Sequence, residues 1–138
     1  MPQLNVLFYH HDKEIQELLE SLFEDTDLVR MVRTSTPGEI PALLKEGDFQ
    51  VVILALSSSQ LDEGQFIYNL VNKHRLLQVI LIAPLVSLTS LINSRELGAD
   101  DVIFKSPELR ENLEESLKGC YQKLLRWNDA LSDYFNKE

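Results

Sequence analysis

The stretch from Phe49 to Ser59, FQVVILALSSS, constrains the possible folds more than any other part of the sequence. Residues 51–56 form an unbroken apolar run of strand length, and small polar residues follow at once. A strand without polar alternation is typical of a parallel sheet that helices cover on both faces. We therefore interpret this stretch as a central strand. Sites in such sheets lie at the carboxyl edge, and here that edge has no charged group before Asp62.

The rest of the chain alternates between short apolar runs and segments with helical spacing. The other predicted strands lie at residues 4–9, 28–32, 77–83 and 102–104. Helices are predicted after Asp12, after Thr36, from about Gln65 to His74, from Ser87 to Leu97 and after Ser106. Residues 36–39, TPGE, have the pattern of a capping box with proline at the first helical position. Strict alternation predicts an α/β fold with a doubly wound parallel sheet and right-handed crossovers.

Composition narrows the classes of function. The chain has 138 residues, a globular apolar content of 44% and a net charge of -9. Its 13 basic residues are scattered, which argues against a nucleic-acid surface. The apolar runs are too short to span a membrane, and the amino terminus has no secretory pattern, so we expect a cytoplasmic protein. Cys120 is the single cysteine and is expected to be a small buried residue.

The last predicted helix is longer than one sheet requires. Its apolar residues recur at alternating spacings of four and three, as in the seam of a packed helix pair: Leu113, Leu117, Cys120, Leu124, Trp127, Leu131 and Tyr134. We divide the chain into a compact unit at residues 1–121 and a helical extension at residues 122–138. The extension must bury its apolar side chains either against the same chain or against a partner, and the spacing favours neither.

Residues 4–120 resemble the receiver domain of bacterial response regulators, the CheY-like family. The segments LFYHHDKEIQELL, EGDFQVVILAL and LGADDVIFKSP are similar to the first strand and helix, the third strand and the fifth strand of that family. The resemblance implies a flavodoxin-like, three-layer sandwich with five strands in the order 2-1-3-4-5. It also implies a site in which an aspartate accepts a phosphoryl group beside a magnesium ion.

The residues at the family's chemical positions depart from its pattern. Ala55 stands at the acceptor position, and His10 and His11 replace the acidic pair. Ala83 takes the position of the hydroxyl residue, Val102 that of the switch aromatic, and only Lys105 is retained. An acyl phosphate needs a carboxylate nucleophile and a cation. The resemblance therefore implies a pseudo-receiver that is not an enzyme and holds no cofactor or metal, with Lys105 in a structural role.

Three other sites are compatible with the sequence. His10 and His11 are side chains of the kind that bind zinc or copper. The serines at residues 57–59 could face the histidines across the carboxyl edge and act in a hydrolase, although no Gly-x-Ser-x-Gly elbow is present. Asp62 could accept phosphate as a non-standard acceptor. Each of these alternatives would make the chain something other than a pseudo-receiver.

A protein-binding function has wider support in the sequence. The fourth predicted helix has more apolar residues than one face of a surface helix needs, which is typical of a contact surface. We expect phosphorylation-independent binding of a protein partner or a second copy, in a pathway of the two-component type. The expected contact residues lie on the fourth helix, the fifth strand and the last helix: Leu88, Leu91, Ile92, Val102, Leu124, Trp127, Leu131 and Tyr134. Trp127 is the expected hot spot.

Overall fold

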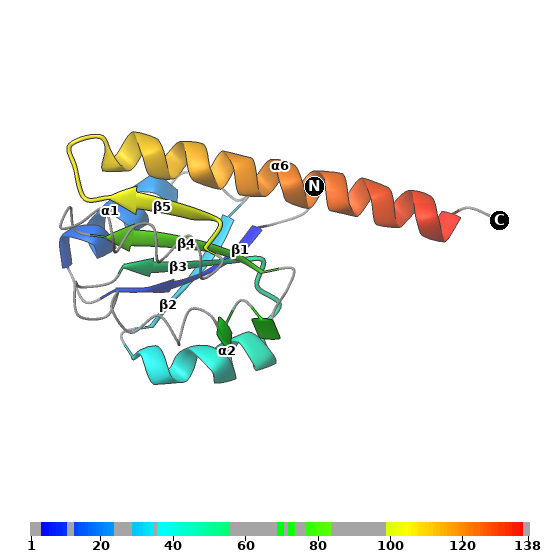
Figure 1. The fold of residues 1–138 in the computed structure, drawn as a ribbon, viewed down its shortest axis with the longest axis horizontal. Coiled ribbons are helices and arrows are strands. Elements are labelled where there is room, and N and C mark those ends of the chain that lie inside the picture. Colours follow the sequence, from blue (N-terminus) through cyan, green and yellow to red (C-terminus); the bar gives the residue numbers. More distant parts are fainter. Residues whose placement is uncertain are drawn as a thin grey trace.

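The computed structural model describes residues 4–10, 13–23, 29–34, 36–55, 69–70, 72–73, 77–83 and 99–136, with side chains of the last range described through Trp127. Its strands are β1 (Leu4–Tyr9), β2 (Val29–Thr34), β3 (Val51–Ala55), β4 (Gln78–Ala83) and β5 (Asp101–Phe104). Its helices are α1 (Lys13–Phe23), α2 (Ile40–Glu46) and α6 (Leu109–Asn136), with a short 3-10 turn at Pro37–Glu39. Figure 1 shows α6 lying along the β5 side of the sheet and α2 on the opposite side of the molecule.

All the strands pair in parallel in the order β2-β1-β3-β4-β5. The predicted fold class and strand order are therefore confirmed. β2 runs two residues further than the sequence pattern indicated, because its pairing with β1 continues to Tyr9 and Thr34. The two added residues, Arg33 and Thr34, are polar, so a prediction based on apolar runs does not include them.

The core has two layers, one on each face of the sheet. Every residue of β3 and β4 is buried, as expected for strands covered on both sides. Successive side chains of a strand point to opposite layers. Ile53 packs in the layer that includes α1 and α6, whereas Leu54 packs in the layer that includes α2. Burial of each such side chain stabilises the fold by about 1.5–3 kcal/mol.

The start of α2 differs from the predicted capping box. A 3-10 turn precedes α2, and its first bond runs from the Glu39 N–H to the Thr36 carbonyl at 3.1 Å. The Glu39 carboxylate accepts a hydrogen bond from the Thr34 hydroxyl at 3.1 Å, and α2 has no side-chain cap. α2 ends at Glu46 and is followed by Gly47, where an added Cβ would lie 2.5 Å from the Phe49 ring.

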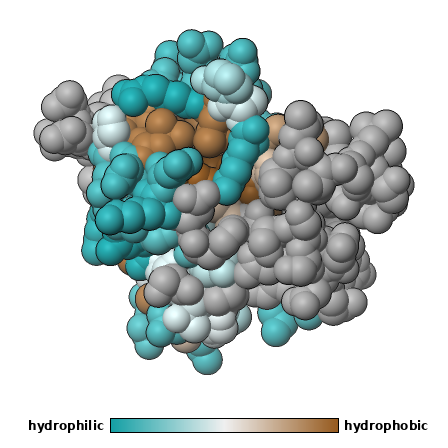
Figure 2. Space-filling model, turned by 90° about the vertical axis from the view of Figure 1, so that its left-hand side faces the viewer, coloured by the Kyte–Doolittle hydropathy of each residue, from teal (hydrophilic) through white to brown (hydrophobic). Residues whose placement is uncertain are grey.

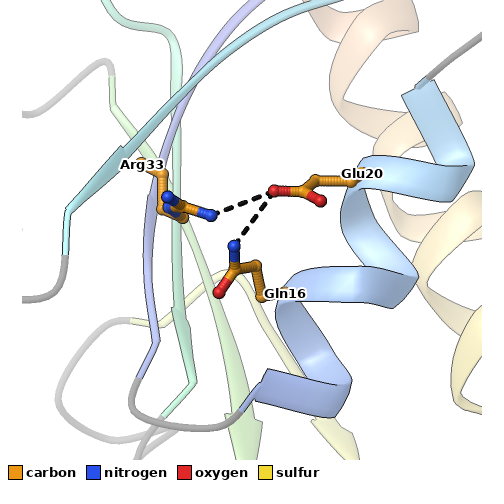
Figure 3. Close-up of polar contacts among 3 residues, drawn as sticks. All are labelled: Gln16, Glu20 and Arg33. Carbon is orange, nitrogen blue, oxygen red and sulfur yellow. Dashed lines mark hydrogen bonds and ion pairs between the residues drawn. The ribbon is translucent and has the colours of Figure 1, made fainter.

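α1 is joined to the edge strand β2 by exposed polar side chains. Arg33 on β2 donates a hydrogen bond to the Glu20 carboxylate at 3.0 Å, and Gln16 donates to the same oxygen at 3.1 Å (Figure 3). The Arg33 and Glu20 side chains are 45% and 54% exposed. Solvent screens such a pair, so its contribution to stability is expected to be below about 1 kcal/mol.

α6 continues past the sheet. Its 28 residues give a length of about 42 Å, against about 20 Å for a six-residue strand. Figure 1 shows its carboxyl-terminal part extending beyond the strands. The predicted division after residue 121 falls inside this continuous helix. In the described part of the chain, no helix combines the length and the apolar character that a membrane span requires.

Two predicted helices lie largely outside this description. Within the predicted helix at 65–74, residues 69–70 and 72–73 are helical. The predicted helix at 87–97, with the expected contact residues Leu88, Leu91 and Ile92, lies outside the described residues.

Candidate functional site

The two central strands end in alanines at the carboxyl edge. Ala55 is the last residue of β3 and Ala83 the last of β4, with exposed fractions of 0% and 2%. Neither side chain carries a nucleophile or a metal ligand. The structure thus places the two predicted positions on neighbouring strands of the sheet edge, where they offer only methyl groups.

His10 directly follows β1 at the same edge. Its ring stacks on Phe8, with the centroids 5.1 Å apart and the planes inclined by 22°. The residue is 9% exposed, and Phe8, on which its ring stacks, belongs to the apolar layer that includes Ile15 and Leu19 of α1. His11, residues 57–59 and Asp62 lie outside the described residues. Among the residues that are described, no three His, Cys, Asp or Glu side chains gather in a way that could hold a metal ion.

Lys105 follows β5, and its backbone N–H donates to the Ala83 carbonyl at 2.9 Å. This bond joins the ends of β4 and β5. Lys105 also lines a hollow of about 450 Å³ between the start of α1 and the start of α6. Apolar Ile15, Leu18 and Leu109 contribute to its wall, and Figure 2 shows an apolar depression with a hydrophilic rim at this end of the molecule.

A larger cavity of about 610 Å³ lies between the sheet and α6, and we call it the β5–α6 groove. Residues 100–104 form much of its sheet side, together with Gln78 and Ile80. On α6 it is lined by Asn112, Glu115, Ser116, Gly119, Cys120 and Lys123.

Polar contacts fix the walls of the β5–α6 groove. The Asp100 carboxylate accepts a hydrogen bond from the Val79 N–H at 2.7 Å, and the Asp101 carboxylate accepts from the Val102 N–H at 2.9 Å. The Gln78 side chain donates to the Cys120 carbonyl at 3.3 Å, which ties the start of β4 to the middle of α6. Because the acidic side chains are bound to the backbone of the sheet, their charges have fixed positions beside β5.

Cys120 lines this groove. It is buried, as the sequence predicted. The pKa of its thiol is raised from 9.0 to about 11, mainly by burial and also by the charges of Asp100 and Asp101, while Lys123 acts in the opposite direction. The thiol is therefore neutral at physiological pH and a poor nucleophile.

The apolar residues of the predicted seam on the last helix differ in how deeply they are buried. Leu113, Leu117 and Cys120 are buried in the core of the same chain, and Leu124 packs partly against it. Trp127 is half-buried, and the side chains of Leu131 and Tyr134 lie outside the described residues. Val102 on β5 is half-buried and lines the groove.

Most residues of the β5–α6 groove are not predicted from the sequence. The sequence pattern predicts no site at Asp100, Asp101, Glu115 or Gly119. The signal on the helix side is the helical spacing of Ser116, Gly119 and Lys123, which places them on one face of α6, and the first two are small. This spacing indicates a groove only when the position of the facing strand β5 is known.

Comparison with known proteins places this fold. No family model and no curated protein matches the sequence. The fold is similar to a pilus assembly-related protein from Burkholderia pseudomallei, with 22% identity, 86% of this chain and 89% of that chain covered, and a TM-score of 0.72. It is also similar to the CheY-like protein TadZ from Pseudomonas aeruginosa, with 18% identity, 86% and 99% covered, and a TM-score of 0.69.

A third similar structure extends over the whole chain. The signal receiver domain of a LuxO repressor protein from Vibrio parahaemolyticus has 17% identity, with 99% of both chains covered and a TM-score of 0.74. At these identities the similarity concerns the fold. The chain therefore has the fold of response-regulator receiver domains.

Proposed function

We propose that this chain is a pseudo-receiver: a signalling module that acts by protein–protein interaction without being phosphorylated. The observation that carries the proposal is Ala55, a buried methyl group at the end of β3 where the receiver resemblance expects the phosphoacceptor aspartate. A pathway of the bacterial two-component type and a cytoplasmic location are part of the proposal.

The chemistry of the carboxyl edge supports a function without catalysis. Phosphoryl transfer to a carboxylate needs the carboxylate itself and a cation held by oxygen ligands. Ala55 and Ala83 supply no oxygen, and the described residue after β1 is the buried imidazole of His10. An imidazole packed on Phe8 is a poor ligand for magnesium.

The part of α6 beyond the core supports interaction with another protein. Leu113 and Leu117 are buried within the chain, whereas Trp127, ten residues after Leu117 on the same helix, is only half-buried. Partly exposed tryptophan is a frequent hot spot of protein interfaces. We propose that Leu124, Trp127, Leu131 and Tyr134 form the contact with a second copy or a partner, together with Leu88, Leu91, Ile92 and Val102.

The interaction is tested by replacing Trp127 with glutamate. Light scattering during size-exclusion chromatography would give the solution mass over a range of protein concentrations. We expect the wild type to associate and Trp127→Glu to remain monomeric, because a carboxylate at the contact opposes burial. Arg126→Glu is the matched control, since residue 126 is exposed on the same turn. A wild type and a variant that are both folded monomers would contradict self-association through this surface.

A further inference from the structure

The hollow between the start of α1 and the start of α6, which we call the α1–α6 hollow, combines an apolar lining with charged groups. Its volume of about 450 Å³ is within the range of sites that hold small organic molecules. Ile15 and Leu109 are buried and Leu18 is half-buried, so both helices contribute aliphatic side chains to the lining. Figure 2 shows the apolar depression within a hydrophilic rim. An aliphatic group that entered the hollow would leave water for an apolar surface.

The charged residues that line the α1–α6 hollow are Lys105, Arg110 and Glu14. Two cations against one carboxylate give the lining an excess of one positive charge, although the whole chain has a net charge of -9. The β5–α6 groove, which three carboxylates and one lysine line, has the opposite excess. Charge complementarity at the α1–α6 hollow therefore favours a monoanion.

Arg110 is held in position beside this hollow. Its Nη1 donates a hydrogen bond to the Ser21 hydroxyl of α1 at 3.2 Å, and its Nε lies 3.6 Å from the Glu114 carboxylate. A guanidinium has five N–H donors in a rigid plane, so these two contacts orient the group without using all its donors. The planar guanidinium matches the two oxygens of a carboxylate. A carboxylate is thus the anionic head group that fits both the charge and the geometry.

We propose that the α1–α6 hollow binds a small amphipathic monocarboxylate, with its aliphatic body on Ile15, Leu18 and Leu109 and its carboxylate on Arg110. Such a ligand would contact the first and the last helix of the chain together. The proposal goes beyond the proposed function, because neither the alanine at the end of β3 nor a protein contact through α6 predicts a small organic ligand.

The probe is octanoate, titrated into the full chain labelled with ¹⁵N and with ¹³C in its methyl groups, and followed by NMR. We expect amide shift changes concentrated at residues 14–18 and 105–110. Nuclear Overhauser effects should join the octanoate methylenes to the methyl groups of Ile15, Leu18 and Leu109. From hexanoate to octanoate to decanoate, each added pair of methylenes should tighten the Kd by between about threefold and fifteenfold, the upper value being that of two fully buried methylenes.

The head group is tested with ligands that have the same aliphatic body. Octanamide should bind at least fivefold more weakly than octanoate, because it loses the charge-assisted hydrogen bonds. Octylammonium should bind more weakly still. Octyl phosphate should bind no more tightly than octanoate, since its second negative charge exceeds the excess of the lining. Tighter binding of octyl phosphate would assign the hollow to phosphate monoesters and overturn the choice of a carboxylate.

Two charge variants, each with a matched control, test the residues around the head group. Arg110→Gln should weaken octanoate at least fivefold and leave octanamide within twofold, whereas Arg126→Gln, at an exposed position of α6 outside the hollow, should change neither. Glu14→Gln removes the one carboxylate of the lining and should tighten octanoate by about twofold to fivefold. Glu17→Gln, exposed on α1 outside the hollow, is its control.

A variant that fills the hollow tests the apolar part. Leu18→Trp should weaken octanoate at least tenfold, because the larger ring occupies the space of the aliphatic body. Leu22→Trp is the matched control, since Leu22 is also half-buried against the core but lies outside the hollow. The thermal unfolding midpoint shows whether both variants are folded, and the charge variants test the proposal independently of them.

Several results would overturn the proposal. These are no shift changes at millimolar octanoate, equal Kd values for octanoate and octanamide, or shift changes confined to residues outside the hollow. Binding to vesicles that contain anionic phosphatidylglycerol in place of free octanoate would assign the surface to a membrane instead, which the net charge of -9 opposes. The proposed function fails on a different observation, the formation of a phosphoryl adduct.

Discussion

The carboxyl edge of the sheet and the β5–α6 groove are formed by the same parallel sheet but differ in the side chains they present. At the edge, β3 and β4 end in Ala55 and Ala83. In the groove, fixed carboxylates and a glycine-lined wall surround a cavity of about 610 Å³. The fold depends on buried strands and on α6, and not on reactive groups at the strand ends. A sheet with this strand order can therefore fold with only methyl groups at the ends of its two central strands.

The largest effect is expected where α6 packs on the sheet. Leu113 is fully buried, so Leu113→Ala should lower the free energy of unfolding by about 2 to 5 kcal/mol, from lost burial and the cavity that remains. Trp127→Ala should cost less than about 1.5 kcal/mol, because its ring is only partly buried. Urea denaturation would measure both. Equal losses would mean that the extension of α6 contributes to the fold as strongly as the part that covers the sheet.

A carboxylate introduced at the end of β3 tests how the carboxyl edge of the sheet differs from the groove. Ala55→Asp places a charge at a fully buried position, and we expect a loss of roughly 2 to 4 kcal/mol at pH 7. Burial raises the pKa of the introduced carboxyl above its ordinary value, so the deficit should be smallest at acidic pH and grow as the pH rises through that pKa. Urea denaturation of wild type and Ala55→Asp across pH 4 to pH 8 tests this. A deficit that does not depend on pH would show that the carboxyl reaches solvent.

Cys120 provides a test on the groove side. Its thiol pKa is raised from 9.0 to about 11 in the folded chain, so the folded state holds the proton more tightly than the unfolded state. Stability contributed by the neutral thiol should be complete below pH 9 and fall between pH 9 and pH 11, by roughly 2 to 3 kcal/mol in total. The difference in unfolding free energy between wild type and Cys120→Val isolates this loss from other titrating groups. A difference that stays constant over that range would place the thiol in contact with water.

The smallest effect is expected on a surface that belongs to neither region. Arg33→Ala removes the bond to Glu20 that Figure 3 shows, and the unfolding free energy should fall by less than about 1 kcal/mol, with the effect reduced at high salt. Chemical denaturation of wild type and Arg33→Ala at low and high ionic strength measures this loss of unfolding free energy. A loss above about 2 kcal/mol would assign the α1–β2 contact a greater part in stability than its exposure indicates.

Much of the fold was predictable because it depends on local patterns. The unbroken apolar runs of β3 and β4 and the helical spacing of α1 and α6 each indicate their own structure. The edge strand β2 was placed less well, since Arg33 and Thr34 join it only through pairing with β1.

The candidate site was predictable only in part. The family resemblance located Ala55, Ala83 and Lys105, because strand ends are fixed by the fold. It could not predict that His10 stacks on Phe8, or that Gly119 faces the groove, because these depend on contacts between segments distant in the sequence. Nor could the sequence predict which apolar residues of α6 are buried in the core, because their burial depends on how α6 packs against the sheet.

The most direct test of the pseudo-receiver function is the intact mass of the protein after incubation with acetyl phosphate and magnesium. A receiver domain of known activity serves as the positive control. We expect the mass of the chain to be unchanged, because the described carboxyl edge offers no acceptor carboxylate. A stoichiometric gain of one phosphoryl group would contradict the proposal, and mapping that group to Asp62, to a histidine or to the serines at 57–59 would identify the site that performs the chemistry.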